Sequence, residues 1–232
     1  MKTGGRVIYM KLNRYMKTML MISGMTLLLS MMSPDSEDDK QWKLSFQKEG
    51  ISVYRNKRAD SPIDELKGEC ILDASLETAA EVMLDVRSYP QWVANCIEAQ
   101  KFNCIDLTTC KLYFTLAMPW PVSDRDVVLQ SSTDIKLSRG RIVGSVYALP
   151  DELVPAHKNR IRIKSMYGKW IFERISTGKT MATFISWADP AGLVPAFIVN
   201  IVSRDVPYRT LKGLRLMVKK DEYIMQGRSF KY

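Results

Sequence analysis

The sequence predicts an α+β fold in which a series of antiparallel strands packs against a long C-terminal helix. The chain has 232 residues, of which 46% are hydrophobic and 25% are charged, and this fits one globular domain with a sizeable core. Strand-length segments with turn residues between them follow one another from residue 51 to residue 187. Apolar residues then recur at helical spacing from Val194 to Val218. We therefore expect a sheet first and a covering helix last.

The first elements of the domain are expected to be strands and one short helix. Residues 41–57 indicate a helical or extended lead, with a strand over Ile51–Asn56. Alternating apolar and polar residues over Glu65–Leu72 predict a half-buried strand. Ser75 is expected to cap a helix that stops at Pro90. The apolar positions of this helix are Leu76, Ala79, Ala80 and Met83.

The middle of the chain predicts three strand pairs. They are Ile97–Cys104 with Cys110–Met118, Asp126–Leu137 with Arg141–Leu149, and Arg160–Ile175 with Thr180–Trp187. In the fifth of these strands, Ile163 and Trp170 occupy positions of opposite parity. A β-bulge near Gly168 would bring both side chains to one face and bend the sheet. A strongly curved sheet is what an internal cavity requires.

The last element is predicted to be an amphipathic helix of about 25 residues. Pro207 lies within it and is expected to kink or split it. Its apolar face consists of Val194, Phe197, Ile201, Tyr208, Leu211, Leu214 and Val218. A basic flank consists of Arg209, Lys212, Arg215, Lys219 and Lys220.

The N-terminal segment has the order of a targeting signal. Lys11, Arg14 and Lys17 precede the uncharged stretch Met19–Met32, and a polar stretch follows. We expect residues 1–33 to be a cleaved signal peptide or an uncleaved membrane anchor, the alternative being a buried helix. Residues 34–40 would be a polar linker and residues 41–232 the folded domain. The protein is then exported, and periplasmic or membrane-associated.

The net charge of +9 comes partly from this segment. Five basic and no acidic residues precede Pro34, whereas 29 basic and 25 acidic residues follow from Pro34 onward. A domain with a charge of +4 permits transient contact with an anionic membrane. No basic helix or aromatic and basic strand motif indicates nucleic-acid binding. We expect a monomer that binds no nucleic acid.

Four cysteines fit an exported protein with up to two disulfides. Cys104 and Cys110 flank a predicted hairpin tip and are the pair that we expect to be bridged. Four separate buried thiols are an equal alternative. The spacings are not those of a zinc site, and His157, the single histidine, is predicted to lie exposed in a polar loop. We expect no metal, no cofactor and no catalytic residues, because no nucleophile, phosphate-binding or dinucleotide motif is found.

The segment from Met118 to Val128 is the most informative of the chain. Trp120 stands between two prolines, which hold the backbone extended, and an Asp-Arg-Asp triplet centred on Arg125 opens the next strand. A buried arginine must have its charge paired and its donors used. Structural pairing is the first interpretation of Arg125, and orientation of the polar head of a ligand is the second.

Together with its neighbours, this segment resembles the START family of lipid-binding proteins, which has the helix-grip fold. The resemblance extends from about Trp42 to about Val218. It comprises Leu66-Lys67-Gly68, Trp92 with Cys96 four residues later, Pro119-Trp120-Pro121 with the acidic and basic triplet, and Asp189-Pro190-Ala191-Gly192-Leu193-Val194-Pro195. The resemblance implies a curved antiparallel sheet wrapped around a long C-terminal helix, with an internal apolar cavity between them.

A binding module follows as the leading functional hypothesis. The cavity would hold a lipid or another hydrophobic small molecule such as a phospholipid, a fatty acid or a sterol-like compound, and the C-terminal helix would act as the gate. The residues expected to contact the ligand are Trp92, Phe114, Met118, Trp120, Arg125, Phe172, Trp187, Phe197 and Ile201. The alternatives are an enzyme of the helix-grip superfamily, a cyclase or hydrolase, and a structural envelope protein whose cavity is filled by side chains.

Overall fold

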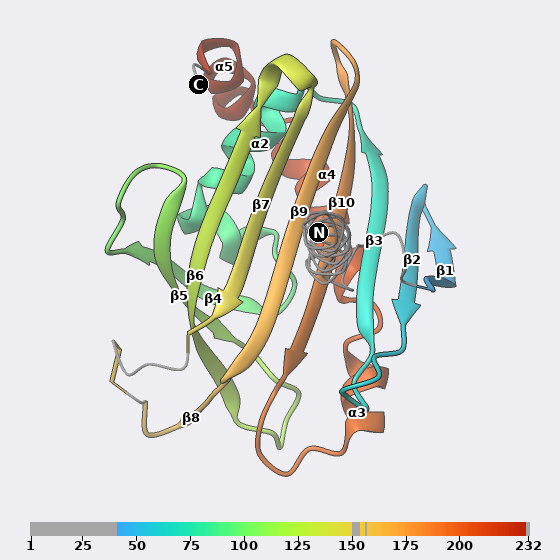
Figure 1. The fold of residues 1–232 in the computed structure, drawn as a ribbon, viewed down its shortest axis with the longest axis vertical. Coiled ribbons are helices and arrows are strands. Elements are labelled where there is room, and N and C mark those ends of the chain that lie inside the picture. Colours follow the sequence, from blue (N-terminus) through green and yellow to red (C-terminus); the bar gives the residue numbers. More distant parts are fainter. Residues whose placement is uncertain (1–40, 150–153, 156, 231–232) are drawn as a thin grey trace, which may run out of the picture. The chain divides into compact units, whose positions relative to one another are not determined.

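A curved, almost entirely antiparallel sheet organises the part of the chain that the computed structural model describes, residues 41–149, 154–155 and 157–230 (Figure 1). The strand order is β1-β2-β3-β10-β9-β7-β6-β5-β4, and β8 pairs in parallel with β6. Gln41–Tyr232 forms one unit by its internal contacts. The predicted targeting segment and the predicted linker lie outside the described residues.

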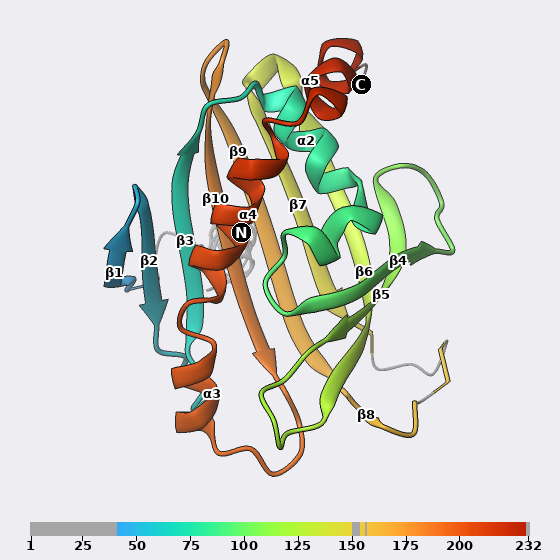
Figure 2. The same cartoon turned by 180° about the vertical axis from the view of Figure 1, so that it is seen from behind.

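The strands are β1 (Lys43–Lys48), β2 (Ile51–Asn56), β3 (Glu65–Leu72), β4 (Cys96–Phe102), β5 (Thr109–Leu116), β6 (Asp124–Lys136), β7 (Arg141–Ala148), β8 (Arg160–Arg162), β9 (Ser165–Ser176) and β10 (Lys179–Asp189). The helices are α2 (Leu76–Leu84), the 3-10 helices η3 (Val86–Gln91) and η4 (Leu137–Arg139), α3 (Ala196–Val202), α4 (Val206–Met217) and α5 (Asp221–Ser229). The helix-grip fold predicted from the sequence is confirmed, with α4 and α2 on the concave face of the sheet (Figure 2).

The predicted bulge at Gly168 is wrong. Strand β9 keeps an unbroken register with both β7 and β10 through this residue. The change of parity instead falls between β8 and β9, where the chain leaves its parallel pairing with β6. The break therefore allows Ile163 and Trp170 both to be buried without an extra residue inside the ladder.

Helix α2 begins as the sequence predicts but ends earlier. The hydroxyl of Ser75 accepts a hydrogen bond from the backbone N–H of Thr78, which caps the first turn. The helix stops at Leu84, and a separate 3-10 helix, η3, carries Pro90. The sequence analysis missed η3, which directs the side chain of Tyr89 into the interior.

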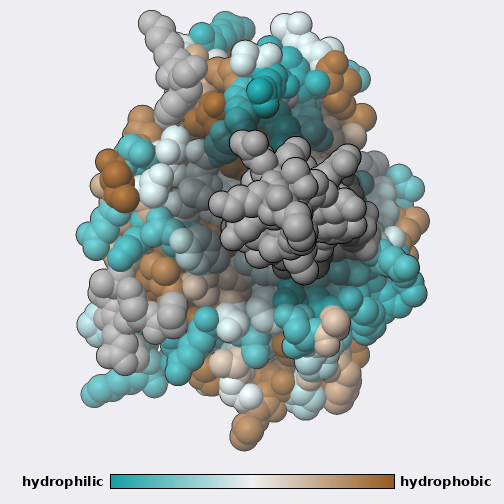
Figure 3. Space-filling view, in the orientation of Figure 1, coloured by the Kyte–Doolittle hydropathy of each residue, from teal (hydrophilic) through white to brown (hydrophobic). Residues whose placement is uncertain are grey.

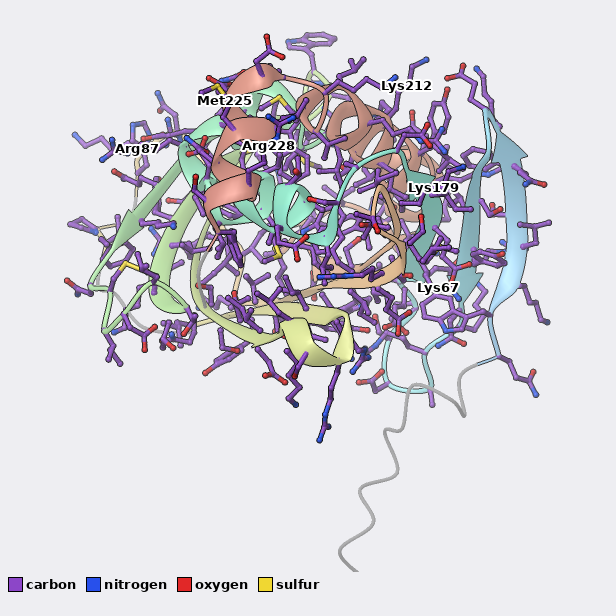
Figure 4. The ribbon with its side chains drawn as sticks, turned by 90° about the horizontal axis from the view of Figure 1, so that it is seen from above. Lys67, Arg87, Lys179, Lys212, Met225 and Arg228 are labelled. Atoms are coloured by element: carbon purple, nitrogen blue, oxygen red, sulfur yellow. A yellow bond between two sulfur atoms is a disulfide. The ribbon has the colours of Figure 1, made fainter. Side chains whose placement is uncertain are left out.

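The predicted C-terminal helix is divided into α3 and α4, and a further helix, α5, follows. The break at residues 203–205 precedes Pro207, which occupies the first turn of α4, where its missing N–H costs nothing. Helices α3 and α5 lie at opposite ends of the sheet (Figures 1 and 2). Seen from above, α5 with Met225 and Arg228 lies over α2 (Figure 4), and the two helices are in contact.

A glycine allows α4 to approach the sheet closely. A Cβ atom at Gly68 on β3 would lie 2.7 Å from Cδ1 of Leu211 and 2.8 Å from Cβ of Pro207. Any side chain there would push α4 outward, because real Cβ contacts are not this short. Gly68 therefore sets the distance between the sheet and the helix that covers it.

The cysteines fall into a bridged pair and two thiols. Cys104 and Cys110 form a disulfide across the β4–β5 connection, whereas Cys70 and Cys96 are buried and free. Burial raises the pKa of Cys70 to about 11 and that of Cys96 to about 12, so both are neutral thiols. None of the helices within the described ranges is long and apolar enough to cross a membrane.

Candidate functional site

A cavity of about 480 Å³ lies between the concave face of the sheet and the helices. Strands β3 to β7, β9 and β10 contribute to its wall, together with α2, η3, α3 and α4. The volume falls within the range of about 300–1,000 Å³ that is usual for small-molecule sites. Aliphatic and aromatic side chains make up most of the lining, so the cavity suits a hydrophobic ligand.

Aromatic rings form the centre of the wall. The Trp170 ring lies 4.5 Å from the ring of Phe184 and 5.7 Å from that of Trp92, measured between centroids. Trp170 and Phe184 line the cavity, while Trp92 belongs to the core and does not line it. The Trp92 indole N–H donates to the Ser88 hydroxyl at 3.1 Å, which satisfies its one polar atom. The packing of the rings and this hydrogen bond therefore hold the aromatic side chains of the wall in place.

Three of the nine residues that the sequence suggested as ligand contacts line the cavity. They are Phe114 on β5, Met118 in the β5–β6 connection and Trp187 on β10. Trp92 and Phe172 are core residues that do not reach the cavity surface. Sequence reasoning missed Trp170. Trp170 and Phe172 point to the same face of β9, but only Trp170 reaches the cavity, and the alternation of residues along the strand cannot distinguish the two.

Trp120, Phe197 and Ile201 point outward. Their side chains are 92%, 64% and 67% exposed, respectively. Helix α3 turns Val199 and Val202 toward the cavity. Six of its seven residues are apolar, so the apolar periodicity of the sequence does not define an inner face. Leu193 is also fully exposed. These four residues, Trp120, Leu193, Phe197 and Ile201, are called the apolar tip below.

The apolar tip lies at one end of the domain. Hydrophobic side chains gather at the lower end of the molecule in Figure 3, where Figure 1 has the β10–α3 and β5–β6 connections. Single exposed apolar residues are ordinary on soluble proteins. Here four large ones occur together, Trp120 on the β5–β6 connection, Leu193 on the β10–α3 connection, and Phe197 and Ile201 on α3 itself.

Arg125 fastens the segment that covers this end of the cavity, residues 189–202, called the cover segment below. Arg125 is 1% exposed and does not line the cavity. It donates to the carbonyls of Pro190 at 2.9 Å and of Ala191 at 3.1 Å, and also to the carbonyl of Ser123. Burial lowers the pKa of Arg125, and Asp124 raises it. Arg125 therefore joins the β5–β6 connection to the start of the cover segment.

Asp126 is paired with another arginine. Its carboxylate accepts hydrogen bonds from Arg162 at 2.8 and 2.9 Å and from the Tyr113 hydroxyl at 3.0 Å. Burial raises the pKa of Asp126, but the hydrogen bonds and the charge of Arg162 outweigh this and lower it overall. This bidentate pair ties β8 to β6. The triplet thus has a structural role, because Arg125 binds the cover segment and Asp126 binds β8. Its aspartates do not form an ion pair with Arg125.

Asn200 fastens the other end of the cover segment. Its side-chain oxygen accepts from the backbone N–H of Asp64 at 2.9 Å, and its amide donates to the carbonyl of Pro62 at 3.1 Å. The Trp187 indole N–H donates to the carbonyl of Ile63 at 3.3 Å. Three hydrogen bonds therefore hold the β2–β3 connection against the cover segment and the strand that precedes it.

Polar groups line the opposite part of the cavity, next to α2 and the disulfide. They include Lys101 on β4 and the hydroxyls of Ser131 and Thr133 on β6. The sequence analysis missed this set, since a lysine in a strand next to a hairpin usually faces solvent. Lys101 pairs with Leu112, which points inward, so the pairing places the Lys101 side chain on the same face. This pairing follows from the β4–β5 register, which the sequence alone does not give.

The charged groups of the lining do not form one catalytic cluster. The charge of Asp85 raises the pKa of Lys101, and that of Arg87 lowers it. Asp64 is paired with Lys57 at 2.8 Å and with Arg55 at 3.9 Å, and Arg209, which also lines the cavity, is paired with Asp205 at 3.0 Å. Among the residues that the structure describes, no group of three or more histidine, cysteine or acidic side chains could hold a metal ion. His157 lies exposed on the surface.

The family model described as START domain matches residues 25–220. An uncharacterized protein of Pseudomonas aeruginosa is 30% identical over 183 residues, 78% of this chain and 88% of that protein. START domain-containing protein 10 of Mus musculus is 23% identical, over 78% of this chain and 62% of that protein.

Solved structures agree with the fold. The STAR-related lipid transfer protein of Xanthomonas axonopodis has a TM-score of 0.70 and 29% identity, covering 77% of this chain and 99% of that chain. Human STARD10 has a TM-score of 0.71 and 20% identity, covering 82% and 78%. From its sequence match over most of its length and its helix-grip architecture, the chain belongs to the START domain family.

Proposed function

We propose that this protein binds a lipid in its internal cavity and carries or shields it from water. The observation that supports this most is the 480 Å³ cavity with its largely apolar wall. Removal of a hydrocarbon chain from water would drive binding, at about 0.8 kcal/mol per buried methylene. The similarity to a STAR-related lipid transfer protein of Xanthomonas axonopodis supports the same ligand class.

The cover segment is proposed to act as the gate. Side-chain hydrogen bonds of Arg125 and Asn200 hold its two ends. Within it, Ala191 and Gly192 have positive φ angles of 56° and 76°, and only one residue of α3, Val199, is buried. Few buried contacts and a few hydrogen bonds are typical of a segment that opens locally at low cost. α4, which buries six residues, would stay in place.

Membrane contact is proposed to use the apolar tip. Its four residues could enter the headgroup region of a bilayer beside the gate. The basic flank of the C-terminal helix offers less support, because most of its charges have partners within the domain. Arg209 pairs with Asp205 at 3.0 Å, and Lys212 pairs with Glu49 at 2.9 Å. Hydrophobic insertion would therefore matter more than attraction to anionic lipids.

We also propose that the protein is exported and works as a monomer without catalysing a reaction. The basic and apolar order of residues 1–33 supports export. Fractionation of cells that express the full-length chain would test it, and recovery of the chain from the cytosol alone would reject it. Light scattering of the purified chain would test the monomer. Three charged residues line the cavity, and two of them, Asp64 and Arg209, are paired with separate partners, which supports a binding role over an enzymatic one.

Native mass spectrometry of the full-length chain, with organic extraction of the bound material, tests lipid binding. A lipid that co-purifies at one per chain is expected. Val146→Phe would fill part of the cavity and lower lipid occupancy, whereas Val143→Phe on the same strand has opposite parity and should not. A wild-type chain that is empty and takes up no fatty acid, phospholipid or sterol would reject the proposal.

A further inference from the structure

One lysine in the wall of the cavity stands without a carboxylate partner in the described part of the chain. Lys101 lines the cavity, and among the residues that the structure describes no carboxylate lies within ion-pair distance of its ammonium. Burial lowers the pKa of Lys101, and the charge of Arg87 lowers it further, while Asp85 raises it. The Asp85 carboxylate is already engaged, since it accepts from the Tyr223 hydroxyl at 2.7 Å. Lys101 as a whole is exposed to solvent, so its ammonium is only partly shielded, and without a carboxylate partner among the described residues it can receive an anion from outside the chain.

Two hydroxyls on the same wall are free to join it. Ser131 and Thr133 both line the cavity from β6, and neither hydroxyl has a hydrogen-bond partner among the described residues. Ser131 lies opposite Cys110, and Thr133 lies opposite Gly144, and both partners face the cavity. A wall built for hydrocarbon alone would carry apolar side chains at these positions.

The sheet register brings these groups within reach of one headgroup. Lys101 on β4 pairs with Leu112 on β5, while Ser131 on β6 pairs with Cys110, the next inward residue of β5. Strands β4 and β6 are separated by one strand, so the backbones of Lys101 and Ser131 lie on the order of 10 Å apart. A lysine side chain spans much of that distance, and one carboxylate or phosphate between them could contact both.

We infer that Lys101, with the hydroxyls of Ser131 and Thr133, binds the anionic headgroup of an amphiphile whose hydrocarbon fills the cavity. The inference rests on the proposed lipid binding and adds the ligand class and its orientation. The headgroup, a carboxylate or a phosphate, lies beside α2 and the disulfide. The hydrocarbon extends past Trp170 and Phe184 toward the cover segment.

Ligands that differ only in the headgroup test this inference. Palmitate, lysophosphatidate with a palmitoyl chain, and uncharged hexadecanol are titrated into the full-length chain, together with Lys101→Met, which keeps the aliphatic stem. An ammonium to anion hydrogen bond stabilises by about 1.5–3 kcal/mol, so loss of the charge should weaken binding of the preferred anionic lipid at least about tenfold. Affinity for hexadecanol should not change. The stronger binder of the two anionic lipids identifies the headgroup, and inorganic phosphate alone should not compete.

Two further variants complete the design. Lys101→Arg keeps the charge and should restore most of the affinity for the anionic lipid. Lys111→Met is the control. Lys111 on β5 stands between the inward residues Cys110 and Leu112 and does not line the cavity, so its loss should leave the affinity for all three ligands unchanged.

The outcomes separate this inference from the proposed function. Wild-type protein that binds all three amphiphiles equally, with Lys101→Met unchanged, would leave lipid binding intact and overturn the role of Lys101. Equal weakening of hexadecanol and palmitate by Lys101→Met would also overturn it, because the effect would then be one of packing. If inorganic phosphate alone competes with the lipids, the ligand of Lys101 is a free anion and not the headgroup of an amphiphile, and the inference is overturned. Failure of wild-type protein to bind any of the three would reject both proposals.

Discussion

Helices α3 and α4 follow each other in the chain and cover the same cavity, but they are held in different ways. Helix α4 buries six residues, and Leu211 and Leu214 are 0% exposed where the helix meets the sheet at Gly68. Helix α3 buries only Val199 and is fastened mainly by Asn200. Dense apolar burial thus makes α4 part of the core, whereas α3, with one buried residue, is the helix for which we propose opening.

The largest effect is expected in α4. Leu214→Ala leaves a cavity in a fully buried site and should lower the free energy of unfolding by about 2–5 kcal/mol. Ile201→Ala on α3 removes an exposed side chain and should change it by no more than about 0.5 kcal/mol. Urea denaturation of both variants measures the difference. Equal losses would show that α3 is packed as firmly as α4.

The next effect is expected at the start of the cover segment. Arg125→Met removes three hydrogen bonds to backbone carbonyls and should cost about 1–3 kcal/mol, because these carbonyls, of which that of Pro190 belongs to a buried residue, lose their donor. Proteolysis should then cut within residues 189–202 before the sheet unfolds. Arg139→Met, at an exposed residue of η4, is the matched control. A stable, uncut Arg125→Met variant would argue that the contacts of α3 suffice.

A smaller effect is expected at Asn200. Asn200→Ala removes both hydrogen bonds to the β2–β3 connection and should lower stability by about 1 kcal/mol. Hydrogen exchange of the Asp64 amide, which donates to Asn200, should accelerate, and release of a bound lipid should accelerate with it. Asn159→Ala in an exposed connection should change neither rate. Faster exchange at Asp64 with unchanged lipid release would separate the cover segment from the exit route.

The smallest effect on stability is expected at the apolar tip. Phe197→Ser should alter the free energy of unfolding by no more than about 0.5 kcal/mol, yet it should reduce binding to phospholipid vesicles. Leu216→Ser on α4 is a control of equal exposure, 66% against 64% for Phe197. Sedimentation with vesicles measures both variants. Equal reductions would place the membrane contact on the general surface and not on the tip.

The sequence predicted those elements whose signals are local. The hydroxyl of Ser75 caps α2 as expected, and the turn before β7 falls at Gly140, whose φ of 63° favours glycine. Pro207 marked the division of the C-terminal helix, because a proline fits only the first turn. The direction of α3 could not be predicted, since six of its seven residues are apolar and only the contacts made in the folded domain select a face.

The site was predicted less well than the fold. Aromatic residues such as Phe172 and Trp170 share parity, and only the three-dimensional outline of the cavity separates the core residue from the lining residue. Arg125 was expected either to pair structurally or to orient a ligand, and it bonds to carbonyls 65 and 66 residues away in sequence. Such partners leave no trace in local spacing.

The pairing of β3 with β10 affects the order in which the chain can fold during synthesis. The Thr180 hydroxyl donates to the carbonyl of Ala74, two groups 106 residues apart, beside the register that pairs Thr180 with Leu72. During synthesis, β3 therefore leaves the ribosome long before its neighbour exists, and one of its edges stays open until β10 follows. Contacts of such long range slow folding and expose strand edges. The nascent chain should depend on chaperones until its last hairpin is complete.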